Sequence, residues 1–346
     1  LIGTYTLELS KEGYARESRE ITIEEGKVLP VNIEMRSGRT YTIQTDRSGD
    51  SIYIDGKRVG VSPQKLELSY GIHTIRAERG EQHTEKELEV TETGGESIVT
   101  LGIGLLSQIH WSSSVTPKQK EVLSRLVGNM VQVDGGRFQM GGTPEQGSDA
   151  DSYEKPVHEV TLSDYYMGKY EVRQSEWEAV MCNNPSYFKG DDLPVEQVSW
   201  EDCHEFIGRL NALTGLSFKL PTEAQWEYAA RGGNLSKGYK YSGSNNLGEV
   251  GWYGCNSGTY THRVGEKQPN ELGLYDMSGN VWEWCEDWSG VYSVTPQRDP
   301  LGAAGGSSQV LRGSCWIGEA RYCRVSYRDG STPGNRFSIL GFRLVC

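Results

Sequence analysis

The first hundred residues alternate between apolar and polar positions. Runs of period two, such as residues 21–23 (ITI) and 88–90 (LEV), are separated by turns that contain Gly and Glu, and this period is typical of half-buried β-strands. Asp55-Gly56 stands between two alternating runs, as a two-residue hairpin turn would. Residues 3–35 and 71–103 share one pattern. We therefore predict a small all-β module that occurs twice, the first copy being partial.

Helical spacing replaces the alternation further along the chain. Residues 102–129 are predicted to form a linker and a short helix, with Pro117 early in it and apolar residues at helical spacing after it. Ser199 and Thr222 each begin a further helix, because a Ser or Thr followed three residues later by Asp or Gln fits a capping box. The later sequence is rich in Gly, Asn, Ser and Trp. For residues 130–346 we predict two helices and a loop-heavy remainder with small strands.

Composition and charge exclude several classes of function. The chain has 346 residues and is 36% apolar, enough for two or three globular domains. Its net charge of -12 is spread along the chain without a block of Lys or Arg, so nucleic acid is not an expected partner. The longest apolar run, VTLGIGLL, is too short for a membrane span. The seven cysteines all follow residue 181 and lack zinc spacing, so structural zinc is not expected.

The pattern YIDGKRVGVSP followed by LELSYGIHTIRAE resembles the PEGA domain, a small β-sandwich found in bacterial cell-envelope and surface proteins. The resemblance covers residues 37–101 and, in part, residues 1–36. It implies an architectural spacer and an extracytoplasmic location at the bacterial surface or envelope. A targeting segment is expected upstream of Leu1, because the sequence opens directly in a strand pattern.

Six further motifs follow in order: VDGGRFQMGG, HEVTLSDYYMGKYEV, LPVEQVSWEDC, LPTEAQWEYAARGG, NELGLYDMSGNVWEWCEDW and LRGSCW…RYCRVSYR…LGFRLV. Together they resemble the formylglycine-generating enzyme (sulfatase-modifying factor) family, whose fold is a variant of the C-type lectin. The expected fold class is thus α+β, with a C-type-lectin-like domain at 130–346 behind the PEGA-like module or modules. Because one fold hosts many activities, the function depends on the site residues.

The resemblance raises the question of whether Cys323 is a catalytic residue. Catalytic members of this family hold copper(I) between two cysteines five residues apart, since thiolates select that ion. Cys323 matches the second of these, but Gly318 stands at the first, and Cys315 replaces a serine of the family's pattern. We therefore expect neither copper nor a catalytic residue. The alternative keeps Cys323 as the catalytic residue of a copper-dependent oxidase that acts on a sulfatase cysteine.

Calcium is the one cofactor that the resemblance favours. In the family, the segment matching LYDMSGNVWEW binds calcium through side-chain and main-chain oxygens, which correspond here to Asp276, Gly279, Val281 and Glu283. Hard oxygen donors suit this ion. The alternative is that the neighbouring tryptophans pack the core and Asp276 caps a turn.

The C-terminal segment also resembles the variable proteins of diversity-generating retroelements, which display a mutable ligand-binding surface. This chain closely follows their template. The template consists of RGGSW, three changeable residues, AR-x-CRVSYR, four changeable residues, P-x-NR, three changeable residues and GFRLV. Such proteins vary through adenine mutagenesis of Asn codons, and Glu319 is the one residue at these positions that an NNC codon does not encode. The resemblance places on the ligand-binding surface Trp316, Ile317, Gly318, Glu319, Tyr322, Asp329, Gly330, Ser331, Thr332, Phe337, Ser338 and Ile339.

Phe337 and Ile339 also fit a second interpretation. They alternate with Ser338, and such alternation fits a half-buried final strand equally well. Weighing these patterns, we predict a non-catalytic surface protein that binds a ligand, most simply another protein, through its C-terminal segment. The alternatives are the copper oxidase and a purely structural envelope scaffold.

Overall fold

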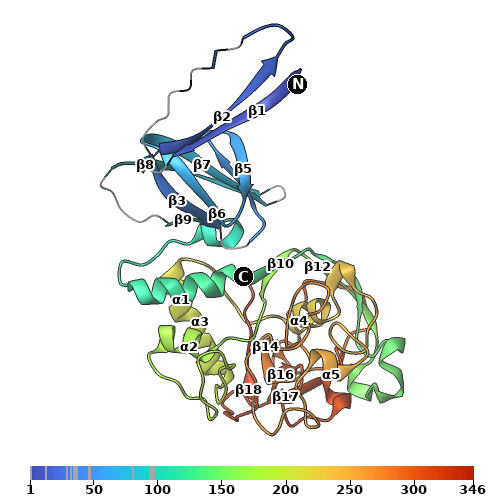
Figure 1. Cartoon of the computed structure of the whole chain (residues 1–346). Helices are drawn as coiled ribbons and strands as arrows, with labels where there is room; N and C mark the ends of the chain where they lie inside the picture. Colours follow the sequence, from blue (N-terminus) through green and yellow to red (C-terminus); the bar gives the residue numbers. More distant parts are fainter. Residues whose placement is uncertain are drawn as a thin grey trace. The chain divides into compact units, whose positions relative to one another are not determined.

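A computed structural model describes residues 2–11, 14–28, 30–31, 33, 38–45, 48–79, 82–92 and 98–346. The chain divides into two compact units, 1–108 and 109–346, which are described one at a time (Figure 1). Part of the predicted repeat at 1–36 lies outside the described residues, and its identity as a partial PEGA-like copy stays a prediction. Within the described ranges, no helix has the length and apolar character needed to cross a bilayer.

In its described residues, the first unit consists of β-strands and one short 3-10 helix, Gly104–Gln108. Asp55 and Gly56 have positive φ angles of 50° and 78° and join two antiparallel strands, which confirms the predicted hairpin turn. Strands β1 and β2 form a separate antiparallel pair, and the other seven form two sheets in the orders β6-β3-β9 and β5-β4-β7-β8. The strands are β1 (Gly3–Lys11), β2 (Tyr14–Ile23), β3 (Gly38–Thr45), β4 (Ser51–Ile54), β5 (Lys57–Val61), β6 (Gln64–Ser69), β7 (Gly71–Arg79), β8 (Gln82–Val90) and β9 (Ile98–Leu101).

Alternate apolar side chains from both sheets meet in one core. Tyr41 and Ile43 of β3 and Ile52 and Ile54 of β4 are buried, and they belong to a single cluster with residues of β7 and β9. Residues at positions i and i+2 lie on one face of a strand. The period of two in the sequence therefore produces the buried faces of a small sandwich.

The second unit has more helices than the sequence pattern predicted. Helices α3 and α4 begin after Ser199 and Thr222, each with a complete capping box, as predicted. Helix α2 was missed, because its cap is Arg173, an unusual residue there, which pairs with Glu176. Figure 1 shows α1, α2 and α3 grouped on one side of this unit. The helices are α1 (Pro117–Gly128), α2 (Gln174–Met181), α3 (Trp200–Thr214), α4 (Glu223–Ala230) and α5 (Leu247–Val250).

Short strands make three sheets in this unit. The sheet that carries the C-terminal segment has the order β17-β16-β14-β18, so β17 and β18 are its two outer strands. Its strands are β14 (Trp282–Trp288), β16 (Gln309–Arg312), β17 (Arg328–Ser331) and β18 (Leu340–Gly341). The other two sheets, β10-β13 and β11-β12-β15, contain β10 (Met130–Val133), β11 (Gly136–Met140), β12 (His158–Leu162), β13 (Tyr165–Gly168) and β15 (Gln297–Arg298).

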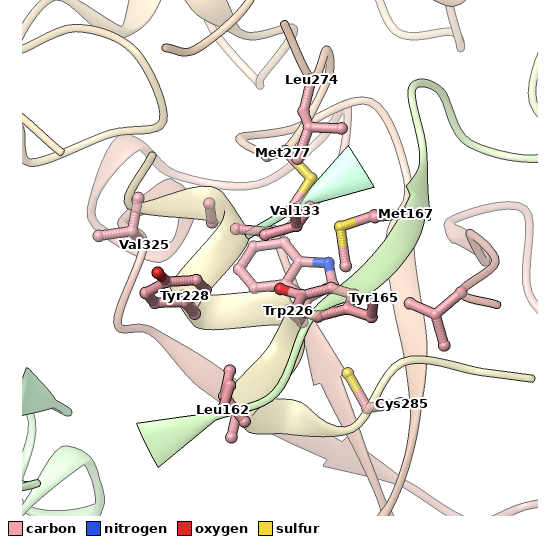
Figure 2. Close-up of a cluster of buried hydrophobic side chains, with 14 of the residues drawn as sticks. Val133, Leu162, Tyr165, Met167, Trp226, Tyr228, Leu274, Met277, Cys285 and Val325 are labelled. Atoms are coloured by element: carbon pink, nitrogen blue, oxygen red, sulfur yellow. The ribbon is translucent and has the colours of Figure 1, made fainter. Parts of the chain in front are cut away.

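Trp226 of α4 lies in the middle of the main core of this unit (Figure 2). Its indole is fully buried, and its Nε1 donates a hydrogen bond to Oε2 of Glu283, 2.6 Å away. Labelled side chains from β10, β12 and β13 surround it together with Met277 and Cys285. Large buried aromatic side chains contribute much of the apolar area that stabilises a domain.

Buried arginines tie the C-terminal segment to this core. Arg324 and Arg343 are inaccessible to solvent and form ion pairs of 2.6 Å with Glu154 and Glu283. Arg312 likewise pairs with Glu227. Breaking such a pair leaves an uncompensated buried charge, which costs about 3–5 kcal/mol. These pairs fix the backbone on either side of the predicted ligand-binding residues.

Candidate functional site

Burial divides the C-terminal segment into two kinds of residue. The stretches 311–315, 323–328 and 340–345 are buried throughout. In contrast, all twelve residues predicted to form the ligand-binding surface are exposed or partly exposed, and the structure describes every one of them. No buried stretch thus contains a changeable position, and every changeable position lies at the surface, where fixed residues such as Arg321 and Arg336 are also exposed.

Trp316 joins two of the three exposed stretches. Its indole Nε1 donates a hydrogen bond of 3.0 Å to the carbonyl oxygen of Ser338, which brings residues 316–319 beside 337–339. Its ring packs edge-on against Phe188, with 5.4 Å between ring centroids. Ser257 donates a hydrogen bond of 2.7 Å to the carbonyl oxygen of Trp316. The position of this stretch therefore depends on two loops that lie far from it in the sequence.

The third exposed stretch, residues 329–332, begins on β17. Because β17 and β18 are opposite outer strands of the sheet, these residues lie across the sheet from residues 337–339. The connecting loop is held by Arg336, whose Nε and Nη2 donate to the Asp202 carboxylate at 2.6 and 2.7 Å. The twelve residues therefore share one chain segment, and Tyr322, which stands apart from the three stretches, packs with its ring centroid 4.8 Å from that of Tyr327.

A pocket of about 490 Å³ adjoins the β17 part of this surface. Asp329 and Gly330 form one wall of it, and Tyr153, Lys155 and Val291 come from other loops. Among the residues that the sequence reasoning missed are Tyr153 here and Tyr187, which is 69% exposed beside Phe188. Their proximity to the predicted surface follows from tertiary contacts, and no local pattern signals it.

The final-strand interpretation of Phe337 and Ile339 is wrong. Phe337 is 51% exposed, and β18 begins only at Leu340. Residues 337–339 instead form a turn in which the amide of Leu340 donates to the carbonyl of Phe337 at 3.0 Å. The alternation arises in a loop whose backbone is fixed at both ends.

The two cysteines of this segment are both buried free thiols. Burial raises the pKa of Cys315 to about 11 and that of Cys323 to about 12, so both thiols are neutral at ordinary pH. A soft copper(I) ion requires two converging thiolates. Gly318 supplies none, and a Cβ built there would lie 2.1 Å from Oγ of Ser314. These residues do not fit the copper site of the catalytic members.

The predicted calcium residues lie around a buried acidic cluster. The Asp276 carboxylate is buried, accepts a hydrogen bond from the amide of Gly265 at 2.7 Å, and leaves Oδ1 without a partner. Burial raises the pKa of Asp276 to about 6. Glu171, which the sequence reasoning missed, is also buried and accepts from the amide of Val281 at 3.1 Å.

This donor set fits calcium in part. Asp276 offers a free oxygen, and three buried carboxylates (Glu171, Asp276 and Glu283) share Arg343 as a compensating charge. Both oxygens of Glu283, however, accept hydrogen bonds from Arg343 at 2.6 Å. Across the described ranges, no group of three or more His, Cys, Asp and Glu side chains is arranged to hold a metal. A calcium ion would therefore depend on the main-chain oxygens of Gly279 and Val281.

The second unit has the C-type-lectin-like fold of the formylglycine-generating enzymes. The model of the sulfatase-modifying factor enzyme 1-like domain matches residues 115–346, about two thirds of the chain, and that of the PEGA domain matches residues 38–98. The chain belongs to the sulfatase-modifying factor enzyme 1-like family and carries a PEGA domain in its first unit. Both sequence resemblances are confirmed.

Two solved structures are similar to this chain over about two thirds of its length. Variable protein 1 of Treponema denticola is 37% identical, with a TM-score of 0.57 over 63% of this chain and 94% of that one. PvdO from Pseudomonas aeruginosa is 27% identical, with a TM-score of 0.55 over 62% of this chain and 93% of that one.

The relatives found by sequence have names that describe different functions. The chaperone protein LppX of Paenibacillus barcinonensis is 35% identical over 218 residues, 49% of this chain and 75% of that protein. The formylglycine-generating enzyme of Streptomyces coelicolor is 34% identical over 191 residues, 50% of this chain. This chain spans 58% of the length of the Streptomyces enzyme. Family membership alone therefore does not assign an activity.

Proposed function

We propose that this protein is a non-catalytic binding protein whose C-terminal segment presents a variable surface to a protein ligand. One observation carries the proposal: every changeable position of the template is exposed or partly exposed, and the stretches 311–315, 323–328 and 340–345 between them are buried. Exposed side chains on a rigid scaffold can change with little effect on folding. The likeness to a variable protein of Treponema denticola supports the same function.

The chemistry of the surface suits a protein ligand. Trp316, Tyr322 and Phe337 contribute aromatic area next to small and polar residues such as Ser331 and Ser338. Aromatic anchors surrounded by adaptable polar groups are typical of recognition loops. Nothing in the charge of the chain favours nucleic acid.

We further place the protein outside the cytoplasm, at the bacterial surface or envelope. The match to a PEGA domain supports this location. Surface labelling of intact cells with a membrane-impermeant amine reagent tests it. We expect labelling of the full chain on intact cells or after osmotic release of the periplasm, and a chain that is labelled only after complete lysis contradicts the location.

The DNA around the gene tests the variable surface directly. We expect a near-copy of the C-terminal codons downstream, with AAC at codons 317, 318, 322, 329–332 and 337–339, and a reverse transcriptase gene close by; Glu319 cannot arise from AAC. If neither exists, variation of the surface is wrong.

The copper oxidase makes a different prediction. After reconstitution with copper(I), an oxidase would bind one ion per chain and convert a cysteine peptide to formylglycine. We expect neither, because Gly318 leaves Cys323 without a second thiolate. Stoichiometric copper together with product would overturn the non-catalytic assignment.

A further inference from the structure

The second unit contains a pocket of about 880 Å³ that none of the twelve predicted ligand-binding residues lines. Its walls come from α3, the start of α4, the end of β14 and the loop that carries Asp299 and Leu301. Pockets for small molecules have volumes of about 300–1,000 Å³. The space is thus large enough for an organic ligand and separate from the surface proposed above.

Helix α3 places three side chains in this pocket, one of them Ile207, and strand β14 places two. Trp200 and His204 are four residues apart on α3, and residues at this spacing lie on one face of a helix. Glu286 and Trp288 are two residues apart on β14, and residues at that spacing share one face of a strand. The pocket is therefore lined by two indoles, from Trp200 and Trp288, and by a His–Glu pair that bridges the two elements.

Contacts within this group hold its members in place. The indole Nε1 of Trp200 donates a hydrogen bond of 3.1 Å to the carbonyl of Cys285. The ring of His204 packs against that indole at a tilt of 49°, with 3.9 Å between centroids. Its Nε2 lies 3.1 Å from Oε2 of Glu286 as an ion-pair contact, without the geometry of a hydrogen bond. Both side chains are about a third exposed. Nε2 of His204 and Oε2 of Glu286 make no hydrogen bond, and both side chains line the pocket wall.

We propose that this pocket binds a neutral oligosaccharide. Indole faces offer flat apolar area to the C–H faces of sugar rings, while an imidazole and a carboxylate can donate to and accept from vicinal hydroxyls in charge-assisted hydrogen bonds. Asp164, Glu286 and Asp299 outnumber Lys219 around the pocket. This excess of negative charge disfavours acidic sugars and leaves neutral ones.

A microarray of neutral and acidic oligosaccharides, probed with the full chain, tests the proposal. The best neutral glycan is then titrated by isothermal calorimetry into wild type, Glu286→Gln and Trp288→Ala. We expect Glu286→Gln to weaken binding about tenfold, because it replaces a charge-assisted hydrogen bond by a weaker neutral one. Trp288→Ala should weaken it at least as much.

Two controls separate this site from other surfaces. Glu178→Gln changes an exposed carboxylate on α2 and should leave glycan binding unchanged. Phe337→Ala alters the C-terminal surface and should also leave it unchanged, so failure here and failure of the proposed protein-binding function are distinguishable. Circular dichroism checks that each variant is folded.

Three outcomes would overturn the glycan site. The first is a folded wild-type chain that binds no neutral glycan, and the second is a chain that binds only acidic glycans. The third is neutral-glycan binding that survives both Glu286→Gln and Trp288→Ala.

Discussion

A Cβ atom built on Gly318 would lie 2.1 Å from Oγ of Ser314 and 3.1 Å from the carbonyl oxygen of Cys315. Ser314 has a φ angle of +67°, a conformation that favours glycine. The turn that a catalytic member would use to hold its first cysteine is therefore closed here by a neighbouring side chain. The absence of a thiol at residue 318 is therefore consistent with the local packing, because Ser314 occupies the space that a side chain would need.

Restoring that cysteine should destabilise the protein. We expect Gly318→Cys to lower the free energy of unfolding by about 1–3 kcal/mol, the usual cost of overpacking. Adding Ser314→Gly should recover most of the loss, because it removes Oγ and suits the positive φ. Urea denaturation of the two single variants and the double variant measures this coupling. A Gly318→Cys protein as stable as wild type would contradict the predicted clash.

Exposed and buried positions of the segment should respond differently to truncation. Ile317 is 54% exposed, whereas Val325 is fully buried in the main core. We expect Ile317→Ala to change stability by less than about 0.5 kcal/mol and Val325→Ala to cost about 2 kcal/mol. Thermal unfolding of both variants provides the comparison. Equal losses would mean that residue 317 packs in the core after all.

Glu196 provides a test by pH. It is fully buried, its Oε1 accepts from the amide of Phe188 at 2.8 Å, and burial raises its pKa from 4.5 to about 7. Between these values the folded protein keeps a proton that the unfolded chain has released. This group therefore lowers stability as pH rises through that window.

Replacing Glu196 by Gln removes this titration. Relative to wild type, we expect Glu196→Gln to gain about 1–3 kcal/mol of unfolding free energy between pH 4.5 and pH 8. Urea denaturation at both pH values measures the change, and Glu178→Gln serves as an exposed control whose difference from wild type should stay constant. A difference for Glu196→Gln that does not grow with pH would argue against a raised pKa.

At the scale of secondary structure, the start of α3 is connected to the candidate surface. Asp202 accepts from the amide of Ser199 at 2.9 Å to complete the capping box. The same carboxylate holds Arg336, the residue before Phe337. The amide of Trp200 also donates to the carbonyl of Pro333 at 2.9 Å. One helix end thus positions the loop between β17 and β18.

Removing this carboxylate should loosen both elements. We expect Asp202→Ala to cost about 1–2 kcal/mol, from the cap and from a half-exposed ion pair, and to speed amide hydrogen exchange in residues 333–340. Asp202→Asn keeps an oxygen that accepts the capping hydrogen bond, so it should lose only the smaller contribution of the ion pair with Arg336 to the free energy of unfolding. As a control, Glu205→Ala removes an exposed pair with Arg209 on the same helix and should leave exchange in that loop unchanged. Unaltered exchange in Asp202→Ala would show that the loop is held by other contacts.

Elements with strong local signals could be predicted from the sequence. The capping boxes at Ser199 and Thr222 and the Asp55-Gly56 turn each depend on residues within a few positions of one another. Helix α2 has an arginine cap that no propensity favours, so it needed tertiary structure to be seen. Short strands such as β15 and β18 have two residues each and carry too few positions for a period to be recognised.

At the scale of the whole molecule, the candidate site could be predicted only as a stretch of sequence. The template located the twelve residues along the chain, and their exposure agrees with it. The hydrogen bond from Trp316 to Ser338 and the approach of Phe188 to Trp316 depend on contacts between residues far apart in the sequence. The same holds for Glu171, whose place beside Asp276 has no local signal.

Calcium should act on the stability of the second unit as a whole. A ligand that binds only the folded state raises the melting temperature as its concentration exceeds the dissociation constant. We expect 5–10 mM calcium, roughly the range needed to saturate a weak site, to raise Tm relative to excess EGTA. Asp276→Asn, which removes the charge beside the unpartnered oxygen, should abolish the shift. Equal Tm values for wild type with calcium and with EGTA would exclude the ion.

The buried ion pairs of Arg312, Arg324 and Arg343 have a consequence for protein engineering. They secure the backbone before, between and after the exposed stretches without using any side chain at the changeable positions. A combinatorial library randomised at those positions, with Gly318 kept because a Cβ there would meet Ser314, should therefore consist mostly of folded clones. Such a library would let new binding specificities be selected on an unchanged framework, much as antibody loops are selected on a constant sandwich.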